Sequence, residues 1–455
     1  MVRFFYNILF TLGFILASPY YYMRMRRRGN WRAGFGQRFG RYDSKLKQAI
    51  TNRHTVWLHA VSVGEVNICT QLIKALEPRL PNIKFVVSTT TTTGMGELQK
   101  KLPAHISKIY YPVDTRWAVR RALTSISPRA IVLVEAEIWP NFLWRARASG
   151  IPTFLVNARL SERSYLGYKR FGVLFRRVFA GFDGVGAQNE EDAKRLVTLG
   201  CRPDVVRIVG SMKYDAARLD GHQAPDVPGL LRRVGVSADA PILLGGSTHD
   251  GEEEILARVY QKLRDRFPGL FLILVPRHFE RSRDVARKLE ALGVRFVYRK
   301  DITASTQPSA DRPECLIVNT TGELRHFYKE ATVVFVGKSL AAHGGQNPIE
   351  PAALAKPIVF GPNMENFGEI VRAFLSTGGA VQVQSERELE TAVAELLENP
   401  QRRRELGARA LKVVRTNLGA MDRTVEMIVD KLRNGDVYVA PLAGEDPAEA
   451  APSLK

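Results

Sequence analysis

The sequence predicts an α/β chain with two doubly wound domains in tandem, preceded by an apolar N-terminal segment. Short β-branched runs alternate with helical patterns from Thr55 onward, which is typical of parallel sheets covered by helices. A polar stretch rich in proline and glycine, "YDAARLDGHQAPDVPG", interrupts this alternation before it resumes. The chain has 455 residues, of which 45% are hydrophobic, and this length favours two domains.

Strand-like runs define the two domains. In the first domain, residues 25–215, they are "TVWLHAV", "IKFVVSTT", "AIVLVEA", "IPTFLVNA", "GFDGVGAQ" and "VVRIVGS". In the second domain, residues 231–433, they are "PILLGGST", "FLILVPR", "VRFVYRK", "CLIVNTTG", "TVVFVGKS", "PIVFGP" and "GAVQVQ". We expect residues 216–230 to form a linker and residues 434–455 a disordered tail, because neither has a periodic apolar pattern.

The net charge of the chain limits the classes of partner that we expect. With 66 Lys and Arg against 46 Asp and Glu, the net charge of +20 suits nucleic acid, an anionic membrane face or a phosphorylated substrate. No nucleic-acid-binding module is recognisable, so we expect no nucleic-acid partner. Cys69, Cys201 and Cys315 form no disulfide or zinc pattern, and the histidines lack ligand spacing. We therefore expect a reducing compartment, no metal and no cofactor.

The N-terminal segment predicts a membrane anchor over residues 1–24. Residues 4–22, "FFYNILFTLGFILASPYYY", carry no charge, and seven arginines with no acid follow between Arg24 and Arg41. The positive-inside rule then places the rest of the chain in the cytoplasm. A signal peptide is the alternative, but the basic cluster follows the apolar run instead of preceding it. Pro19 and Asn7 leave open whether the segment spans the bilayer or lies in the interface.

Glu65 is the first candidate for chemistry. In "WLHAVSVGEV" a strand runs into a small-residue turn that contains Ser62 and Gly64, and a helix follows. Sites in doubly wound folds lie at the carboxyl ends of the strands, so Glu65 stands where a reacting group is expected. The alternative is an acid that only stabilises the start of a helix.

Further polar residues follow the other strands of the first domain. Thr92 belongs to the hydroxyl-rich segment "STTTTTGMGE", and Glu135 and Glu137 belong to "VEAEIWPN". Two acids separated by one residue face the same side of an extended chain, so they could orient a substrate hydroxyl. A structural ion pair with an arginine such as Arg159 is an equal alternative.

In the second domain, glycine-rich turns after strands suggest phosphate binding. "GGSTHDGEE" contains Ser247 and Thr248, and "AHGGQNPIEPA" contains Gly345, Asn347 and Glu350. Free backbone N–H groups at such turns can hold a phosphate, and a nearby acid can reach ribose hydroxyls. Tight turns use glycine for purely steric reasons as well, so each motif alone is weak evidence.

Two basic positions support an anionic ligand. Arg277 and His278 follow the buried-type strand "LFLILVPR", where an arginine is costly without an anion or a salt bridge. Lys213 in "GSMKYD" has the equivalent position after "VVRIVG", although an ordinary surface lysine is the simpler interpretation there. Residues 161–182 interleave basic and aromatic residues at helical spacing, which suits either anionic lipid or an amphipathic helix with an aromatic core face.

Together these motifs resemble the Kdo (3-deoxy-D-manno-octulosonic acid) transferases. The resemblance extends from the anchor to about residue 425 and includes "HAVSVGEV", "TTTTTG", "EAEIWPN", "NARLSERS", "GSMKYD", "GSTHDGEE", "VPRHFER", "TTGEL" and "HGGQNPIEPA" in this order. It implies a GT-B glycosyltransferase fold, in which two Rossmann-like domains face a cleft. It further implies inverting transfer of Kdo from CMP-Kdo to a lipid A precursor at the cytoplasmic face of the bacterial inner membrane.

The resemblance also assigns roles to residues. Glu65 would be the general base, and Arg277 and Lys213 would stabilise charge on the leaving phosphate without a metal. The full set of expected site residues is as follows: catalytic Glu65 and Glu137; donor-binding Lys213, Ser247, Thr248, Arg277, His278, Gly345, Asn347 and Glu350; acceptor-binding Ser62, Gly64, Thr92, Glu135 and Arg159.

The sequence departs from the family pattern at a few positions. Asn319 stands before "TTGEL" where the family usually has Asp, "EAEIWPN" replaces "ETELWPN", and "GSMK" replaces "GNLK". These changes affect the expected details of donor positioning and the number of Kdo units added. Two rival functions are another membrane-associated GT-B transferase that uses a UDP-sugar, and a catalytically silent lipid-binding protein on the same scaffold.

Overall fold

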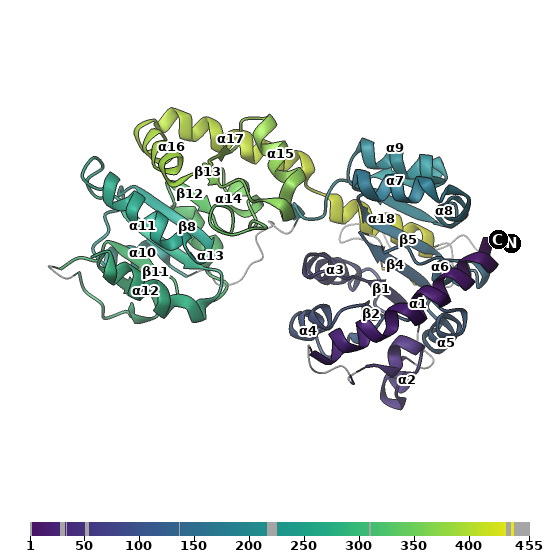
Figure 1. Cartoon of the computed structure of the whole chain (residues 1–455). Helices are drawn as coiled ribbons and strands as arrows, with labels where there is room; N and C mark the ends of the chain where they lie inside the picture. Colours follow the sequence, from purple (N-terminus) through teal and green to yellow (C-terminus); the bar gives the residue numbers. More distant parts are fainter. Residues whose placement is uncertain are drawn as a thin grey trace. The chain divides into compact units, whose positions relative to one another are not determined.

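The structure, a computed structural model, describes residues 2–27, 32, 34–50, 54–135, 137–215, 225–308, 311–433 and 438–440. The chain divides into two compact units. The first consists of Met1–Ala216 together with Leu418–Lys455, and the second of Ala217–Asn417. Each unit is built on one parallel sheet, as the alternating pattern of the sequence predicts (Figure 1).

The sheet of the first unit has seven parallel strands in the order β3-β2-β1-β4-β5-β6-β7. Their bounds are β1 (His54–His59), β2 (Ile83–Thr89), β3 (Ser107–Tyr110), β4 (Ala130–Val134), β5 (Thr153–Ala158), β6 (Gly184–Ala187) and β7 (Val206–Ile208). The six runs expected from the sequence are confirmed as strands. Strand β3 was missed, because this short edge strand begins with two polar, half-buried residues and shows no clear apolar pattern.

Helices cover both faces of this sheet. They are α1 (Val2–Arg27), α2 (Ser44–Ile50), α3 (Val63–Leu76), α4 (Thr92–Lys101), α5 (Arg116–Ile126), α6 (Pro140–Ala148), α7 (Glu162–Arg170), α8 (Gly172–Phe179), α9 (Glu190–Leu199) and α18 (Ala420–Arg433). Along β1, Val56 and Leu58 pack into one core cluster and Trp57 into the other. Successive strand residues point to opposite faces, so the central residues of β1 are apolar in sequence because both faces of the sheet are buried.

Helix α18 corrects the expected domain boundary. The sequence pattern assigned residues 231–433 to the second domain, but α18 packs on α3 and β6 of the first unit. The carboxylate of Asp215 accepts hydrogen bonds from the backbone N–H groups of Gly419 (2.8 Å) and Met421 (2.7 Å), which fixes the start of α18 there. Sequence periodicity identifies the helix but does not reveal which sheet it covers.

The expected disordered tail is ordered at one point. Val439 is buried in the core of the first unit, and Ala440 exchanges two hydrogen bonds with Arg79. Residues 434–437 and 441–455 of this tail lie outside the described residues. The tail therefore contains a docked segment at residues 438–440, which the lack of a periodic apolar pattern in the sequence did not predict.

The second unit has its own sheet of seven parallel strands, in the order β10-β11-β9-β8-β12-β13-β14. Their bounds are β8 (Ile242–Thr248), β9 (Phe271–Pro276), β10 (Phe296–Tyr298), β11 (Cys315–Ile317), β12 (Val333–Val336), β13 (Ile358–Phe360) and β14 (Val381–Gln382). All seven runs expected from the sequence are confirmed as strands. The helices are α10 (Val227–Arg233), α11 (Glu252–Leu263), α12 (Ser282–Ala291), α13 (Leu324–Glu330), α14 (Ile349–Ala353), α15 (Gly368–Ser376), α16 (Glu386–Glu398) and α17 (Pro400–Asn417).

The end of the expected linker is part of the second unit. Residues 227–230 begin α10, where Val227, Leu230 and Leu231 are buried. Residues 216–224 lie outside the described residues. Pro228 of this Pro-rich stretch occupies the first turn of a helix, where its missing N–H costs nothing.

Helix α1 contains the expected apolar segment. Val2–Met23 has a mean hydropathy of 1.4 and is long and apolar enough to cross a membrane, a weak indication that rests on length and composition alone. Its first turns lie against α6 (Figure 1). Tyr6 and Trp144 form an edge-to-face ring pair there. Beyond this contact, apolar side chains such as Leu9 (69% exposed) and Leu16 (82% exposed) face outward.

The basic and aromatic segment 161–182 forms two helices, α7 and α8, which meet at Phe171. Tyr168, Phe175 and Phe179 pack against one another over the core, so the prediction of an amphipathic helix with an aromatic core face is confirmed. The arginines and lysines of these helices are exposed, together with Phe171 and Val173. Contact of this surface with lipid stays a prediction.

In each sheet, the strand order reverses beside the first strand of the unit. In the first unit, β1 lies between β2 and β4, so the reversal falls between β1 and β4; in the second unit it falls between β8 and β12. Ligands of open α/β sheets bind beside the carboxyl ends of the strands at such a switch point. The loops after β1, β4, β8 and β12 are therefore the places where function is expected.

Candidate functional site

Glu65 begins α3 at the switch point of the first sheet. The hydroxyl of Ser62, the N-cap residue, accepts a hydrogen bond from the backbone N–H of Glu65 (3.2 Å). The Glu65 carboxylate reaches back and accepts the backbone N–H of Val61 through Oε2 (2.8 Å). This reciprocal arrangement resembles a capping box, which stabilises helix starts. Glu65 thus performs the structural role weighed in the sequence analysis, whatever its chemical role.

The environment of Glu65 prepares it to accept a proton. Burial raises the pKa of its carboxyl group, the hydrogen bonds from Val61 and Ser62 oppose this shift, and the nearby charge of Glu135 raises the pKa further. Within the part of the chain that the structure describes, Oε1 accepts no hydrogen bond, so one oxygen is free to receive a proton. A carboxylate with a raised pKa is a stronger base than an ordinary surface glutamate.

Glu135 follows β4 and is held in place by two partners. Its Oε1 accepts a hydrogen bond from the amide nitrogen of Asn157 (2.7 Å) and lies 3.4 Å from Nζ of Lys213. Glu135 and Asn157 both have positive φ, 60° and 52°, a backbone strain that often occurs at functional sites. Lys213, expected on the donor side, thus lies in the first unit and pairs with the candidate acceptor residue Glu135.

Glu137 faces a histidine that the sequence analysis did not single out. His59 lies at the end of β1 and is 1% exposed, its Nδ1 bonds Oγ of Ser88 (2.9 Å), and its Nε2 lies 3.9 Å from Oε2 of Glu137. Burial alone would raise the pKa of Glu137, but His59 and the indole N–H of Trp139 (3.1 Å) bring the net pKa below its usual value. Glu137 therefore stays ionised. The signal for His59 in the sequence was its position in an otherwise apolar run.

The remaining acceptor-side candidates surround these carboxylates. Thr92 begins α4 and is half-buried, and the hydroxyls of the preceding Thr89 and Thr91 donate to the carbonyl of Val61 (3.5 and 3.4 Å). Since Val61 also donates to Glu65, the threonine segment and Glu65 share one turn. Arg159 follows β5 and is half-buried. Ser62 and Gly64 are exposed beside Glu65.

The second unit gathers Glu350, Asn347 and Arg277. The amide nitrogen of Asn347 donates to Oε1 of Glu350 (3.1 Å). Burial raises the pKa of Glu350, while Asn347 and the charges of Arg325 and Arg277 lower it. Arg277 is exposed just after β9 and is fixed by its backbone N–H, which donates to the carbonyl of Thr248 (3.0 Å). Arg325 joins this group from α13 and was not identified from the sequence.

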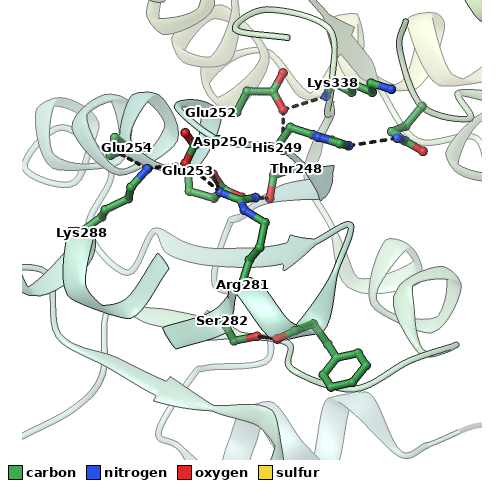
Figure 2. A network of polar contacts seen from close by, with 12 residues as sticks. Thr248, His249, Asp250, Glu252, Glu253, Glu254, Arg281, Ser282, Lys288 and Lys338 are labelled. Carbon is green, nitrogen blue, oxygen red and sulfur yellow. Dashed lines mark hydrogen bonds and ion pairs between the residues drawn. The ribbon is translucent and has the colours of Figure 1, made fainter. Parts of the chain in front are cut away.

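The turn after β8 is held by two buried acids (Figure 2). Glu252 accepts the backbone N–H groups of His249 (2.9 Å), Lys338 (2.7 Å), Ser339 (2.8 Å) and Leu340 (3.1 Å). This carboxylate therefore joins the loops after β8 and β12 at the switch point. The acids that begin α11 stand out in the sequence only as part of a motif, because their burial is not visible there.

Glu253, the second buried acid, has different partners. It accepts the hydroxyl of Thr248 (2.9 Å) and pairs with Arg281 (2.8 Å). The Thr248 hydroxyl therefore donates its proton to Glu253 and not to a ligand. The backbone carbonyl of Thr248 accepts the N–H of Arg277 and positions that residue. Ser247, which precedes Thr248, has a positive φ of 53°. The ring of the exposed His278 lies 6.1 Å from the ring of His249, measured between centroids.

Gly345 completes the donor-side candidates. Its φ is +70°, and a Cβ atom there would lie 2.5 Å from Sδ of Met364, so only glycine fits. The structure thus brings Ser247, Thr248, Arg277 and His278 together at the ends of β8 and β9. Gly345, Asn347 and Glu350 lie on the segment that follows β12. The exposed Arg277 in the second unit suits anion binding. The Glu65 carboxylate in the first unit suits proton abstraction.

Comparison with known proteins agrees with this chemistry. Residues 33–216 match the family model described as 3-deoxy-D-manno-octulosonic-acid transferase (kdotransferase), and residues 314–413 match glycosyl transferases group 1. The 3-deoxy-D-manno-octulosonic acid transferase of Bordetella pertussis is 31% identical over 441 residues, which cover 93% of this chain and 99% of that protein. This chain belongs to the Kdo transferase family. The recognition made from the sequence motifs is thereby confirmed.

Further relatives agree with this membership. The 3-deoxy-D-manno-octulosonic acid transferase of Haemophilus influenzae is 30% identical over 434 residues, which cover 94% of this chain and 98% of that protein. A glycosyltransferase structure from Rickettsia africae covers 84% of this chain and 99% of its own, with a TM-score of 0.52 and 13% identity. At this identity the likeness concerns the fold alone. The Kdo transferase chain is therefore a glycosyltransferase with the expected GT-B fold.

Proposed function

We propose that this Kdo transferase moves Kdo from CMP-Kdo to a hydroxyl group of a lipid A precursor, with inversion at the anomeric carbon. The observation that carries this proposal is Glu65, a carboxylate with a raised pKa and an unbonded oxygen at the switch point of the first sheet. In a single displacement, the acceptor hydroxyl oxygen attacks the anomeric carbon, the bond to the CMP phosphate breaks, and Glu65 takes the hydroxyl proton.

The other carboxylates of the first unit would have different tasks. Glu137 stays ionised because its pKa is lowered, so it is suited to electrostatic stabilisation and not to proton transfer. Glu135, held by Asn157 and Lys213, would orient an acceptor hydroxyl. Ser62, Gly64, Thr92 and Arg159 are proposed to contact the same acceptor, since they lie at the ends of the strands and helices around Glu65.

The second unit would bind the donor. Arg277 is exposed and oriented by Thr248, which suits a phosphate contact, and Asn347 with Glu350 offers an amide and a carboxylate for ribose hydroxyls. Ser247, His278 and Gly345 would shape the same site. Lys213 is proposed as a further phosphate ligand, although in this structure its ammonium group pairs with Glu135.

The acceptor and the anchor suggest where the reaction occurs. A lipid A precursor resides in the membrane, and α1 presents an apolar surface of membrane-spanning length. We propose that the enzyme works at the cytoplasmic face of the bacterial inner membrane, with α1 as its anchor and the basic surface of α7 and α8 near anionic head groups.

The test is transfer of Kdo from CMP-Kdo, generated in situ, to a lipid A precursor in detergent, followed by mass spectrometry of the lipid. A mass increase of one or more Kdo units is expected, together with inhibition by CMP in preference to UDP. Product formation from a UDP-sugar instead would support the rival transferase. If a control enzyme is active in the same assay and this protein forms no product, the proposed donor and acceptor are wrong.

A further inference from the structure

Lys338 has an unusual position at the switch point of the second sheet. It follows β12, beside the end of β8, where the strand order reverses. Its φ of 58° lies in the left-handed region, which side chains with a Cβ atom rarely adopt. Such strain persists only where the surrounding structure enforces it, and it is concentrated at functional sites.

The backbone of Lys338 is fixed on both sides, and Figure 2 shows the bond to Glu252. Its N–H donates to the buried carboxylate of Glu252 (2.7 Å), and its carbonyl accepts the N–H of Gly345 (2.8 Å). The preceding Gly337 is pressed against the carbonyl of Ser247, where a Cβ atom would come within 2.4 Å. Lys338 is thus tied to the turns that carry two donor-side candidates, Ser247 and Gly345.

The ammonium group of Lys338 has no anionic partner among the described residues. It is half-buried, and no described carboxylate forms an ion pair with it. A Cβ atom added at Gly344 would lie 3.5 Å from its Nζ, which places the ammonium beside the glycine turn. Together with burial, its positive charge lowers the pKa of His249, as do His278 and Arg281. Arg281 is neutralised by Glu253 and Asp250, whereas Lys338 is not.

We propose that Lys338 binds an oxyanion of the sugar donor and so contributes to donor specificity. The inference rests on the proposed function, since that function supplies the donor. Lys338 is a half-buried cation without a counter-ion among the described residues. It lies beside Gly344 and Gly345, which have positive φ, at a switch point of the sheet. Such a cation is suited to a charge-assisted hydrogen bond. CMP-Kdo offers two such groups, the phosphate and the sugar carboxylate, which share the chemistry of an oxygen anion.

The variants Lys338→Met, Lys338→Arg and Lys338→Gly test this proposal in the full-length protein in detergent. Lys338→Met is expected to raise the KM for CMP-Kdo by roughly 10- to 100-fold, the range for loss of a hydrogen bond to a charged group. Lys338→Arg should retain most of the affinity. Lys338→Gly removes the charge and also relieves the backbone strain, so its KM should rise while its melting temperature does not fall.

Ala355→Gly is the matched control. Ala355 has a similar φ of 54° in the same unit but lies beside α17, so its replacement should affect stability and leave KM unchanged. Unchanged KM in both Lys338→Met and Lys338→Gly, measured with an active wild type, would overturn the inference while the proposed function stands.

Binding of CMP, measured by calorimetry, separates the two oxyanions. A weaker CMP affinity in Lys338→Met assigns the phosphate, and an unchanged CMP affinity with a raised KM for CMP-Kdo assigns the carboxylate. If the wild type binds CMP but transfers nothing, the proposed function fails, and a loss of CMP affinity in Lys338→Met still supports the phosphate contact. Unchanged CMP affinity in that case, or no CMP binding by the wild type, removes the Lys338 proposal as well.

Discussion

The backbone N–H of Val61 donates to Oε2 of Glu65 across 2.8 Å, so the candidate base also closes the turn on which it stands. Val61 also holds the threonine segment in place, because its carbonyl accepts hydrogen bonds from the hydroxyls of Thr89 and Thr91. Removing the Glu65 side chain would therefore change both the chemistry and the local structure. A useful substitution has to separate these two effects.

Glu65→Gln separates them. Glutamine can still accept the Val61 N–H, so thermal stability should change by less than about 0.5 kcal/mol, whereas Glu65→Ala should cost about 1 kcal/mol through loss of the cap. Glutamine cannot accept the acceptor proton, so kcat should fall by roughly 10²- to 10⁴-fold in both variants. Thermal denaturation and product mass spectrometry measure the two quantities. A fully active Glu65→Gln would exclude Glu65 as the base.

The pH dependence of the reaction should report the raised pKa of Glu65. The base is active when ionised, so kcat/KM should fall as the pH drops through this pKa, at a higher pH than for an ordinary glutamate. Because the charge of Glu135 contributes to the shift, Glu135→Gln should move the acidic limb of the profile to lower pH. Glu190→Gln, at an exposed position of α9, should leave the limb in place. If Glu135→Gln does not shift the acidic limb, the pKa that the limb reports belongs to a group other than Glu65.

The sequence predicted most of the fold because buried parallel strands are continuous apolar runs, and thirteen of these runs were visible. It also predicted Glu65, Glu135 and Arg277 as strand-end residues. The rest depends on contacts between distant segments. The pairing of His59 with Glu137, the docking of α18 on the first unit, and the four amides held by Glu252 arise from tertiary packing, which periodicity does not record.

Gly345→Ala tests the geometry of the donor loop. The new Cβ atom would meet Met364, including its backbone, and the φ of +70° is unfavourable for alanine, so stability should fall by about 1 to 2 kcal/mol or more. The displaced loop should also raise the KM for CMP-Kdo. Gly378→Ala is the matched control, because its φ of +64° gives the same strain but its neighbour is the flexible end of Arg409. Equal KM values in the two variants would contradict a role of this loop in donor binding.

Tyr6 of α1 should stabilise the first unit in a pH-dependent manner. Its hydroxyl donates to Oδ2 of Asp114 (2.8 Å), a buried carboxyl group that also accepts the backbone N–H groups of Asn141 and Phe142 (each 2.9 Å). Burial raises the pKa of Asp114 to about 7, and the hydrogen bonds oppose this shift. Since the folded pKa exceeds the unfolded value, the stability that Asp114 contributes is present at low pH and is lost as the pH rises towards 7.

Tyr6→Phe removes one of the hydrogen bonds that stabilise the ionised carboxylate, so the pKa of Asp114 should rise further. The variant should therefore lose about 1 to 3 kcal/mol of stability at pH 8, where Asp114 is ionised, and clearly less at pH 5, where it is protonated. Tyr20→Phe, at a 62% exposed position of the same helix, should lose nothing at either pH. Thermal denaturation in detergent measures all three proteins. An equal loss for Tyr6→Phe at both pH values would show that the Tyr6 hydroxyl contributes independently of the charge on Asp114. No loss at either pH would show that α1 is held by its apolar contacts with Trp144, which phenylalanine retains.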